Sequence, residues 1–253
     1  MIQLEQRMEL PSSVLDLLPL FQSERANKKR QATRVEQERL QLQARHRYLW
    51  LRGMVEYSFA GLLLLFLAPV IFILGMAIRL TSSGPAIYSQ VRVGAHGRRF
   101  AIYKLRTMSY NCEAKSGPVW AAKNDPRVTW LGAILRKTHL DELPQLWNVL
   151  RGEMSLIGPR PERPEFVTKL ETEIPEYGKR LAIRPGITGL AQISQAPDTT
   201  IHCVRRKTKY DLFYIQKMNW RMDLQILVAT GLKALGLNRY RICAEKPEKI
   251  KIG

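Results

Sequence analysis

A single long apolar run, residues 57–80, most constrains how this chain can fold. It includes the stretch GLLLLFLAPVIFILGMAI and has no charged side chain before Arg79. About 20 apolar residues are enough for a helix to cross the hydrocarbon core of a bilayer. A buried helix of a soluble core is seldom this long, so we expect the chain to enter a membrane.

Pro69 interrupts this run and predicts a bend, because proline removes a helical hydrogen bond. Basic residues flank the run on both sides: Arg45, Arg47 and Arg52 before it, and Arg79, Arg92, Arg98 and Arg99 after it. A simple span would place one basic flank outside, against the positive-inside tendency. A re-entrant helix that bends at Ala68 and Pro69 keeps both flanks in the cytoplasm. On these grounds a kinked transmembrane helix and a re-entrant helix are equally supported.

Further along, Asp141 and Glu142 form an adjacent acidic pair within THLDELPQLWNVLRGEMSLIGPRPE, residues 138–162. Arg136 precedes the pair and Arg160 follows it. A carboxylate can act as a nucleophile or a metal ligand, and arginine binds phosphate oxygens through two hydrogen bonds. The arrangement therefore suits chemistry on a phosphate. An acidic pair taken alone is more often part of a solvated surface helix.

The charge balance implies an anionic partner. The 253 residues include 40 Lys and Arg against 22 Asp and Glu, a formal net charge of +18. Nucleic acid, an anionic membrane surface and phosphorylated substrates are the three candidates. We expect no nucleic-acid partner, because no recognition helix or zinc-finger spacing accompanies the charge. The three cysteines show no CxxC pair, and the few histidines argue against zinc.

Alternating residues in 86–92 and 99–104 predict a β-hairpin around a glycine-containing turn. Lys104 and Arg106 at the end of its second strand would suit a phosphate site. Helical periodicity is found over 131–136, 140–150, 162–173, 210–215 and 224–232, and a short strand is predicted over 191–193. We therefore expect an α/β fold, mainly helical, with a small β-hairpin or sheet.

Four blocks in fixed order resemble the bacterial sugar transferase family, the monotopic phosphoglycosyl transferases. In this chain they read APVIFILGMAIRLTSSGPAIYSQVRVGAHGRRFAIYKLRTM, NDPRVTWLGAILRKTHLDELPQLWNVLRGEMSLIGPRPERPEF, RPGITGLAQI and YDLFYIQKMNWRMDLQIL. The resemblance extends from Glu56 to about Leu232. The order and spacing of four blocks are far more specific than any one motif, and they favour a functional role for the acidic pair.

The resemblance implies an enzyme that transfers a phosphosugar from a nucleoside diphosphate sugar, usually a UDP-sugar, to a polyprenol phosphate. The products are a polyprenyl diphosphosugar and UMP, and the reaction starts the assembly of a glycan. By resemblance, Asp141 is the nucleophile that carries a covalent phosphosugar, and Glu142 is associated with a required Mg²⁺. Lys104, Arg106, Arg136, Arg160 and Arg184 are the expected phosphate-binding residues.

The resemblance also favours the re-entrant alternative, with the bend at Ala68 and Pro69, and a place at the cytoplasmic face of the bacterial inner membrane. We expect a polar helical extension over 1–50, a re-entrant membrane helix over 51–82, a cytoplasmic catalytic domain over 83–240 and a basic tail over 241–253. A homo-oligomer is retained among the expected partners. The alternative to an enzyme is a non-catalytic scaffold whose basic charge holds anionic lipid.

Three positions depart from the pattern of the family. Glu56 stands where relatives more often carry aspartate, and Val91 replaces a usual acidic residue. The segment 194–198, SQAPD, replaces an asparagine–glycine pair that is typical of many relatives. The last departure bears on the sugar-binding details.

Overall fold

The computed structural model describes residues 12–112, 125–195 and 200–237, with side chains from residue 47 onward. The chain divides into two compact units, one up to Arg52 and the other from Gly53 onward. The second unit contains every element discussed below except the first part of helix α1. The predicted basic tail, 241–253, lies outside the described residues.

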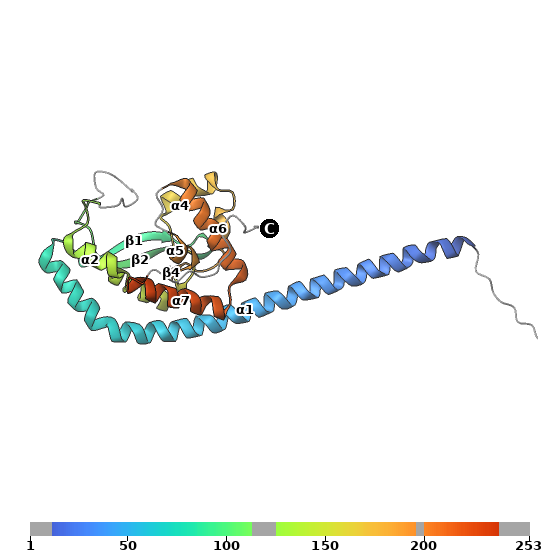
Figure 1. Ribbon diagram of the computed structural model, residues 1–253, viewed down its shortest axis with the longest axis horizontal. Helices are drawn as coiled ribbons and strands as arrows, with labels where there is room; N and C mark the ends of the chain where they lie inside the picture. Colours follow the sequence, from blue (N-terminus) through green and yellow to red (C-terminus); the bar gives the residue numbers. More distant parts are fainter. Residues whose placement is uncertain (1–11, 113–124, 196–199, 238–253) are drawn as a thin grey trace, which may run out of the picture. The chain divides into compact units, whose positions relative to one another are not determined.

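Helix α1 runs from Ser12 to Thr81, through both the predicted extension and the predicted membrane helix. Within the described residues, its part Arg47–Thr81 is the one helix long and apolar enough to cross a membrane. Large side chains such as Phe66 and Phe72 are about 70% or more exposed. The ribbon of α1 bends in its turquoise part (Figure 1). An exposed apolar helix of this kind is a candidate for association with a membrane.

The predicted hairpin is confirmed. Strands β1 (Ile87–Val93) and β2 (Arg99–Leu105) pair antiparallel, with Val91 opposite Ala101. The short 3₁₀ helix η1 (Ala95–Gly97) forms the connection. The alternation predicted this pairing correctly because one face of the hairpin is buried against the core.

Thr129 caps helix α2 (Trp130–Thr138), because its hydroxyl accepts a hydrogen bond from the amide of Gly132. Beyond it, the helix predicted over 140–150 is divided into the 3₁₀ helix η2 (Leu140–Glu142) and helix α3 (Gln145–Leu150). Pro144 separates the two. Proline is tolerated at a helix start but not in a helix interior, which explains the break.

A second sheet of two short parallel strands was not predicted. Strand β3 (Ser155–Ile157) pairs with β4 (Gly186–Thr188). A Cβ atom at Gly186 would lie 2.0 Å from the backbone nitrogen of Gly158, so only glycine allows this approach. The strand predicted over 191–193 is wrong, because these residues belong to helix α5 (Leu190–Ser194).

Four further helices complete the fold: α4 (Pro164–Glu173), η3 (Tyr177–Ala182), α6 (Ile201–Lys217) and α7 (Trp220–Ala234). The helices predicted over 162–173, 210–215 and 224–232 are confirmed, and α6 begins earlier than predicted. The main core joins Leu146, Val149, Met154, Leu212 and Ile226. This core also includes Phe100 and Ile102 of β2, whereas Leu135 of α2 belongs to a separate cluster. The structure is therefore mostly helical with two small sheets, as expected.

Candidate active site

The acidic pair lies on η2, directly after a sharp turn of the backbone. His139 adopts a left-handed conformation (φ 58°), which ends α2 and redirects the chain into η2. Asp141 is buried, with 7% of its surface exposed. Within the described part of the chain, no hydrogen bond or ion pair holds its carboxylate. Burial raises the pKa of Asp141, and the nearby Lys104 only partly opposes this. Asp141 is thus a buried, unrestrained carboxylate.

Its neighbour Glu142 has the opposite environment. The Lys104 ammonium donates to Glu142 Oε1 at 2.6 Å, and the Arg160 guanidinium donates to both carboxylate oxygens. Burial alone would raise the pKa of Glu142, but Arg160 and Lys104 hold it well below its usual range. Glu142 is therefore a fixed anion that orients two cations beside Asp141.

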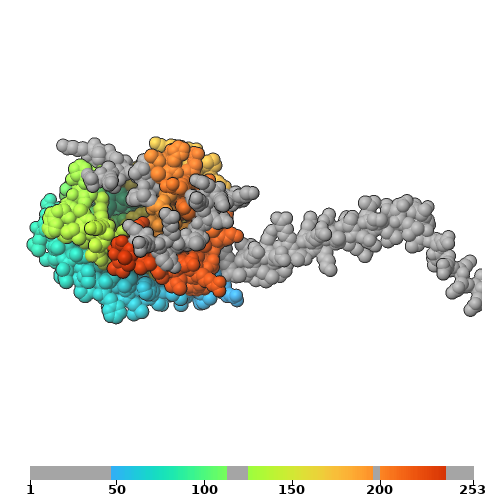
Figure 2. Space-filling view, viewed as in Figure 1, coloured from blue at the N-terminus to red at the C-terminus, as the bar shows by residue number. Residues whose placement is uncertain are grey.

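These groups line a polar cavity of about 900 Å³. Seven arginine and lysine residues and three acidic residues contribute to its wall: Arg92, Lys104, Arg106, Arg127, Arg136, Arg160, Arg163, Asp141, Glu142 and Glu162. In Figure 2 the turquoise-green strands lie at the floor of a recess between yellow-green α2 and orange α6. The excess of cations makes this cavity suited to a ligand with several negative charges, such as a diphosphate.

Two further predicted cations lie in this wall. Arg106 is buried, and its Nη2 donates to the Ser82 backbone oxygen at 2.9 Å and to the Ser82 hydroxyl at 2.8 Å. Its Nε and Nη1 have no hydrogen-bond partner among the described residues. Arg136 is held by a bond from Nε to the Thr107 hydroxyl at 2.9 Å. Buried donors without a partner are costly, so a bound phosphate would relieve Arg106.

Arg184 is the one predicted phosphate-binding residue that the structure places apart. It is not among the residues that line the polar cavity. Its Nη1 donates to the Tyr57 hydroxyl of α1 at 2.6 Å, and its guanidinium lies over the Tyr57 ring. Arg184 therefore anchors the start of β4 to α1 in this structure.

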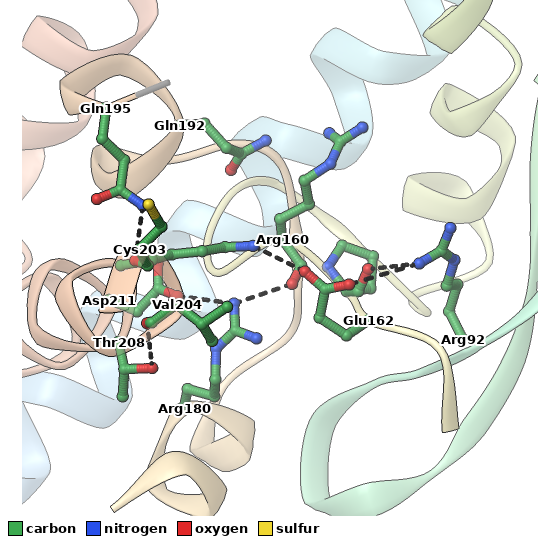
Figure 3. A network of polar contacts seen from close by, with 12 residues as sticks. Arg92, Arg160, Glu162, Arg180, Gln192, Gln195, Cys203, Val204, Thr208 and Asp211 are labelled. Carbon is green, nitrogen blue, oxygen red and sulfur yellow. Dashed lines mark hydrogen bonds and ion pairs between the residues drawn. The ribbon is translucent and has the colours of Figure 1, made fainter. Parts of the chain in front are cut away.

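Glu162 is a residue of the site that the sequence analysis did not single out. Figure 3 shows Glu162 with the Arg92 side chain of β1 extending toward it. Lys207 donates to Glu162 at 2.7 Å, and Arg92 lies 3.7 Å away. Burial alone would raise the pKa of Glu162, but Lys207 and Arg180, and to a smaller extent Arg92, lower it to about 2. The basic character of 203–217 was visible in the sequence, whereas this pairing was not.

A second buried ion pair supports Arg160 from behind. Arg180 on η3 donates through Nη2 to Asp211 on α6 at 2.7 Å, and both side chains are almost fully buried. Arg180 also donates to the Tyr177 hydroxyl at 2.6 Å. The same Nη2 contacts the backbone oxygen of Arg160 at 3.0 Å (Figure 3). Arg180 thus fixes the backbone from which the Arg160 guanidinium extends toward Glu142.

The donor set fits only a particular kind of metal site. No group of three or more His, Cys, Asp or Glu side chains could hold an ion within the described residues. Asp141 and Glu142 are the adjacent carboxylates in the polar cavity. Mg²⁺ is commonly bound by one or two carboxylates together with substrate phosphates and water. The residues present therefore fit a Mg²⁺ that arrives with a diphosphate.

Comparison with known proteins identifies the family of this chain. The bacterial sugar transferase family matches residues 47–236, and the chain belongs to this family. A Bacillus subtilis (strain 168) protein, provisionally named as an undecaprenyl-phosphate N-acetylgalactosaminyl 1-phosphate transferase, is 52% identical over 53% of this chain and 75% of its own length.

Two other relatives resemble more of the chain. The UDP-glucose:undecaprenyl-phosphate glucose-1-phosphate transferase of Caulobacter vibrioides is 43% identical over 68% of this chain and 64% of its own length. The exopolysaccharide production protein PSS of Rhizobium leguminosarum bv. phaseoli is 40% identical over 68% of this chain and 88% of its own length. Another relative, from Aeromonas hydrophila, is matched over only 38% of its length. The chain thus spans between about two fifths and nine tenths of these relatives.

Proposed function

We propose that this protein transfers a phosphosugar from a UDP-sugar to a polyprenol phosphate and so initiates the assembly of a glycan. One observation carries the proposal. An unrestrained carboxylate, Asp141, lies beside a cation-held carboxylate, Glu142, in the wall of a strongly basic cavity. Family membership supports the same reaction, because several relatives are named as undecaprenyl-phosphate sugar phosphate transferases.

In the first step we assign the nucleophile to Asp141. A carboxylate oxygen attacks the phosphorus that bears the sugar, and the bond from this phosphorus to the oxygen of the UMP phosphate breaks. UMP leaves with that electron pair, and Asp141 carries the phosphosugar as an acyl phosphate. Lys104, Arg136 and Arg160 reduce the repulsion between an anionic nucleophile and an anionic diphosphate, which is the main electrostatic barrier to such an attack.

In the second step an oxygen of the polyprenol phosphate attacks the same phosphorus. The acyl phosphate bond breaks, the Asp141 carboxylate is restored, and the product is a polyprenyl diphosphosugar. A carboxylate is a good leaving group from phosphorus, so two moderate barriers replace one. Glu142 keeps its place throughout, because Lys104 and Arg160 hold it.

We further propose that Mg²⁺ is required. The residue that would hold it is Glu142, together with diphosphate oxygens and water. When bound, Mg²⁺ supplies charge neutralisation at the diphosphate. Lys104 and Arg160 already compensate Glu142, so we expect weak metal binding before the nucleotide sugar arrives.

We propose that α1 enters the cytoplasmic leaflet of the bacterial inner membrane and returns, with its bend at Ala68 and Pro69. The basic residues on both flanks of the apolar part and the bend of the ribbon support this topology. Cysteines introduced near Arg52 and near Thr81 should both react with an impermeant reagent from the cytoplasmic side only. Labelling of one of them from outside would establish a spanning helix.

The direct test of the reaction uses the full chain with a panel of UDP-sugars, including UDP-glucose and UDP-N-acetylgalactosamine. Undecaprenyl phosphate, Mg²⁺ and detergent complete the assay, and UMP release is measured. We expect UMP release and a phosphosugar-linked lipid with at least one of these donors. A protein that binds membranes but releases no UMP with any donor would instead be the non-catalytic scaffold.

The nucleophile is tested without the lipid, by intact-protein mass analysis after incubation with the active donor. The native protein should gain the mass of one phosphosugar, and Asp141→Asn should gain none. An adduct on Asp141→Asn would show that another residue attacks. Turnover with lipid but no adduct in the native protein would favour direct transfer in a ternary complex.

A further inference from the structure

A second cavity, of about 560 Å³, shares Glu142 of the acidic pair with the polar cavity, whereas Asp141 lines the polar cavity alone. Its wall is formed by α1, α5 and α7 together with residues around β3 and β4. By area most of the wall is apolar, and its apolar members include Phe59, Leu63, Leu146, Ile187, Ile193 and Leu227. Lys207 and Lys233 line it as well. Its volume lies within the range of roughly 300–1,000 Å³ that is usual for pockets that enclose small ligands.

The two cavities meet at one wall. His139, Glu142, Arg160 and Glu162 line both of them. The Arg160 side chain is 34% exposed, and its contacts with Glu142 use Nη1 and Nη2. A guanidinium has five N–H groups, so Arg160 retains donors for an anion that enters from either side. The apolar cavity therefore ends at a cation beside Asp141.

The α1 side of the apolar cavity indicates where its ligand comes from. Phe59 and Leu63 precede Pro69 on the apolar part of α1, the part that is long and apolar enough to enter a membrane. A ligand that leaves the bilayer along this helix would keep an apolar tail in apolar surroundings. Such a tail needs no hydrogen-bond partners, and its anionic head would lie at Arg160. These requirements describe an isoprenyl phosphate and are poorly met by a nucleotide sugar.

We propose that the apolar cavity holds the first isoprenoid units of the acceptor lipid, with the lipid phosphate at Arg160, while the nucleotide sugar occupies the polar cavity. The inference rests on the proposed function. Donor and acceptor then reach the Asp141–Glu142 wall from different sides. Filling the apolar cavity should consequently impair use of the lipid and leave use of the nucleotide sugar intact.

Leu227→Trp is the test, and Leu224→Trp is its matched control. Both residues lie on α7 three positions apart, but Leu224 is 61% exposed and does not line the cavity. We expect Leu227→Trp to raise the KM for undecaprenyl phosphate by about tenfold, the scale on which a pocket discriminates against one misfitting group. The KM for the active UDP-sugar should stay near its native value, and Leu224→Trp should change neither constant.

A larger rise in the KM for the UDP-sugar than for the lipid would overturn the proposal and place the donor in the apolar cavity. Equal effects of Leu227→Trp and Leu224→Trp would overturn it as well. A native protein that releases no UMP with any donor would refute the proposed function itself, which is a separate result.

A second measurement does not depend on any variant. The native protein is photolabelled with a benzophenone-bearing isoprenyl phosphate, and the crosslinked peptides are mapped by mass spectrometry. Crosslinks on α5 and α7 that undecaprenyl phosphate competes away are expected. Crosslinks confined to β1 and β2, in the wall of the polar cavity, would contradict the proposal.

Discussion

Replacing Glu142 with glutamine tests the central electrostatic arrangement of the site. The side chain keeps its shape, but its contacts with Lys104 and Arg160 change from charged to neutral. A hydrogen bond to a charged group contributes about 1.5–3 kcal/mol and a neutral one about 0.5–1.5 kcal/mol. Two contacts would together lose about 2–3 kcal/mol, and the partial exposure of Arg160 reduces this to about 2 kcal/mol. For a unit of this size, the loss corresponds to a Tm lower by roughly 4–8 °C.

The same substitution should also change the pH dependence of the reaction. Asp141 attacks in its ionised form, so the rate falls as the pH drops through the pKa of Asp141. Burial raises this pKa, and the negative charge of Glu142 raises it further. In Glu142→Gln that charge is lost, and Lys104 is released to stabilise ionised Asp141. The acidic limb of UMP release against pH should therefore move to lower pH, although the maximal rate falls.

Thermal unfolding in detergent and UMP release across a pH series measure the two effects. Glu173→Gln is the control, because its ion pair with Lys169 is long, at 3.9 Å, and solvent-exposed. It should change the free energy of unfolding by less than about 0.5 kcal/mol. If Glu142→Gln has the Tm of this control, the ion pairs of Glu142 are not formed in solution. An acidic limb that stays in place would refute the coupling between the two carboxylates.

Three more predictions concern the surroundings of the pair. Asp141→Asn should raise the Tm at neutral pH. Because the pKa of Asp141 is raised in the folded protein, its ionisation lowers the free energy of unfolding as the pH increases. The gain in Tm should vanish at acidic pH, where Asp141 is protonated. Arg160→Lys should cost on the order of 1 to 3 kcal/mol of transition-state stabilisation through kcat/KM, whereas Arg184→Lys should leave kcat/KM nearly unchanged; equal losses would return Arg184 to the site. Asp211→Ala should lower the free energy of unfolding by about 3–5 kcal/mol, because it leaves Arg180 as an uncompensated buried charge; a loss below about 1 kcal/mol would contradict the buried pair.

Local patterns predicted the fold correctly where the periodicity of the side chains was bounded by a turn residue. The hairpin combines alternation with a glycine turn, and both of its strands formed as expected. The short run at 191–193 has no such support, since three residues cannot distinguish a strand from a helical turn, and it forms α5. Strands β3 and β4 are three residues each and pair across about 30 positions. Such pairing depends on backbone approach at Gly158 and Gly186, which no periodicity reveals.

Local motifs also predicted part of the candidate site. The local motifs supplied Asp141, Glu142 and Arg160, and the structure brings them together with Lys104 and Arg106 in one wall. Arg184 lies in an equally suggestive motif, but its side chain extends to Tyr57. The sequence gives the charge of a basic residue near a motif but not the direction in which its side chain points. It therefore could not distinguish Arg160, which lines the cavity, from Arg184, which does not.

Charge alone could not identify the cations that are available to a substrate. Arg180 is engaged by Asp211 and Tyr177, and Lys207 by Glu162, so neither can bind a phosphate without breaking a buried contact. The acidic partners, Asp211 and Glu162, are 31 and 45 positions away in the sequence. What distinguishes Arg106 is therefore not its charge but its buried donors without a partner in the described structure, in the wall of the polar cavity. The charges of Arg180 and Lys207 are paired in the folded protein and stabilise the structure around the cavity. The desolvation of Arg106 is not offset in this way, so a bound anionic ligand would offset it.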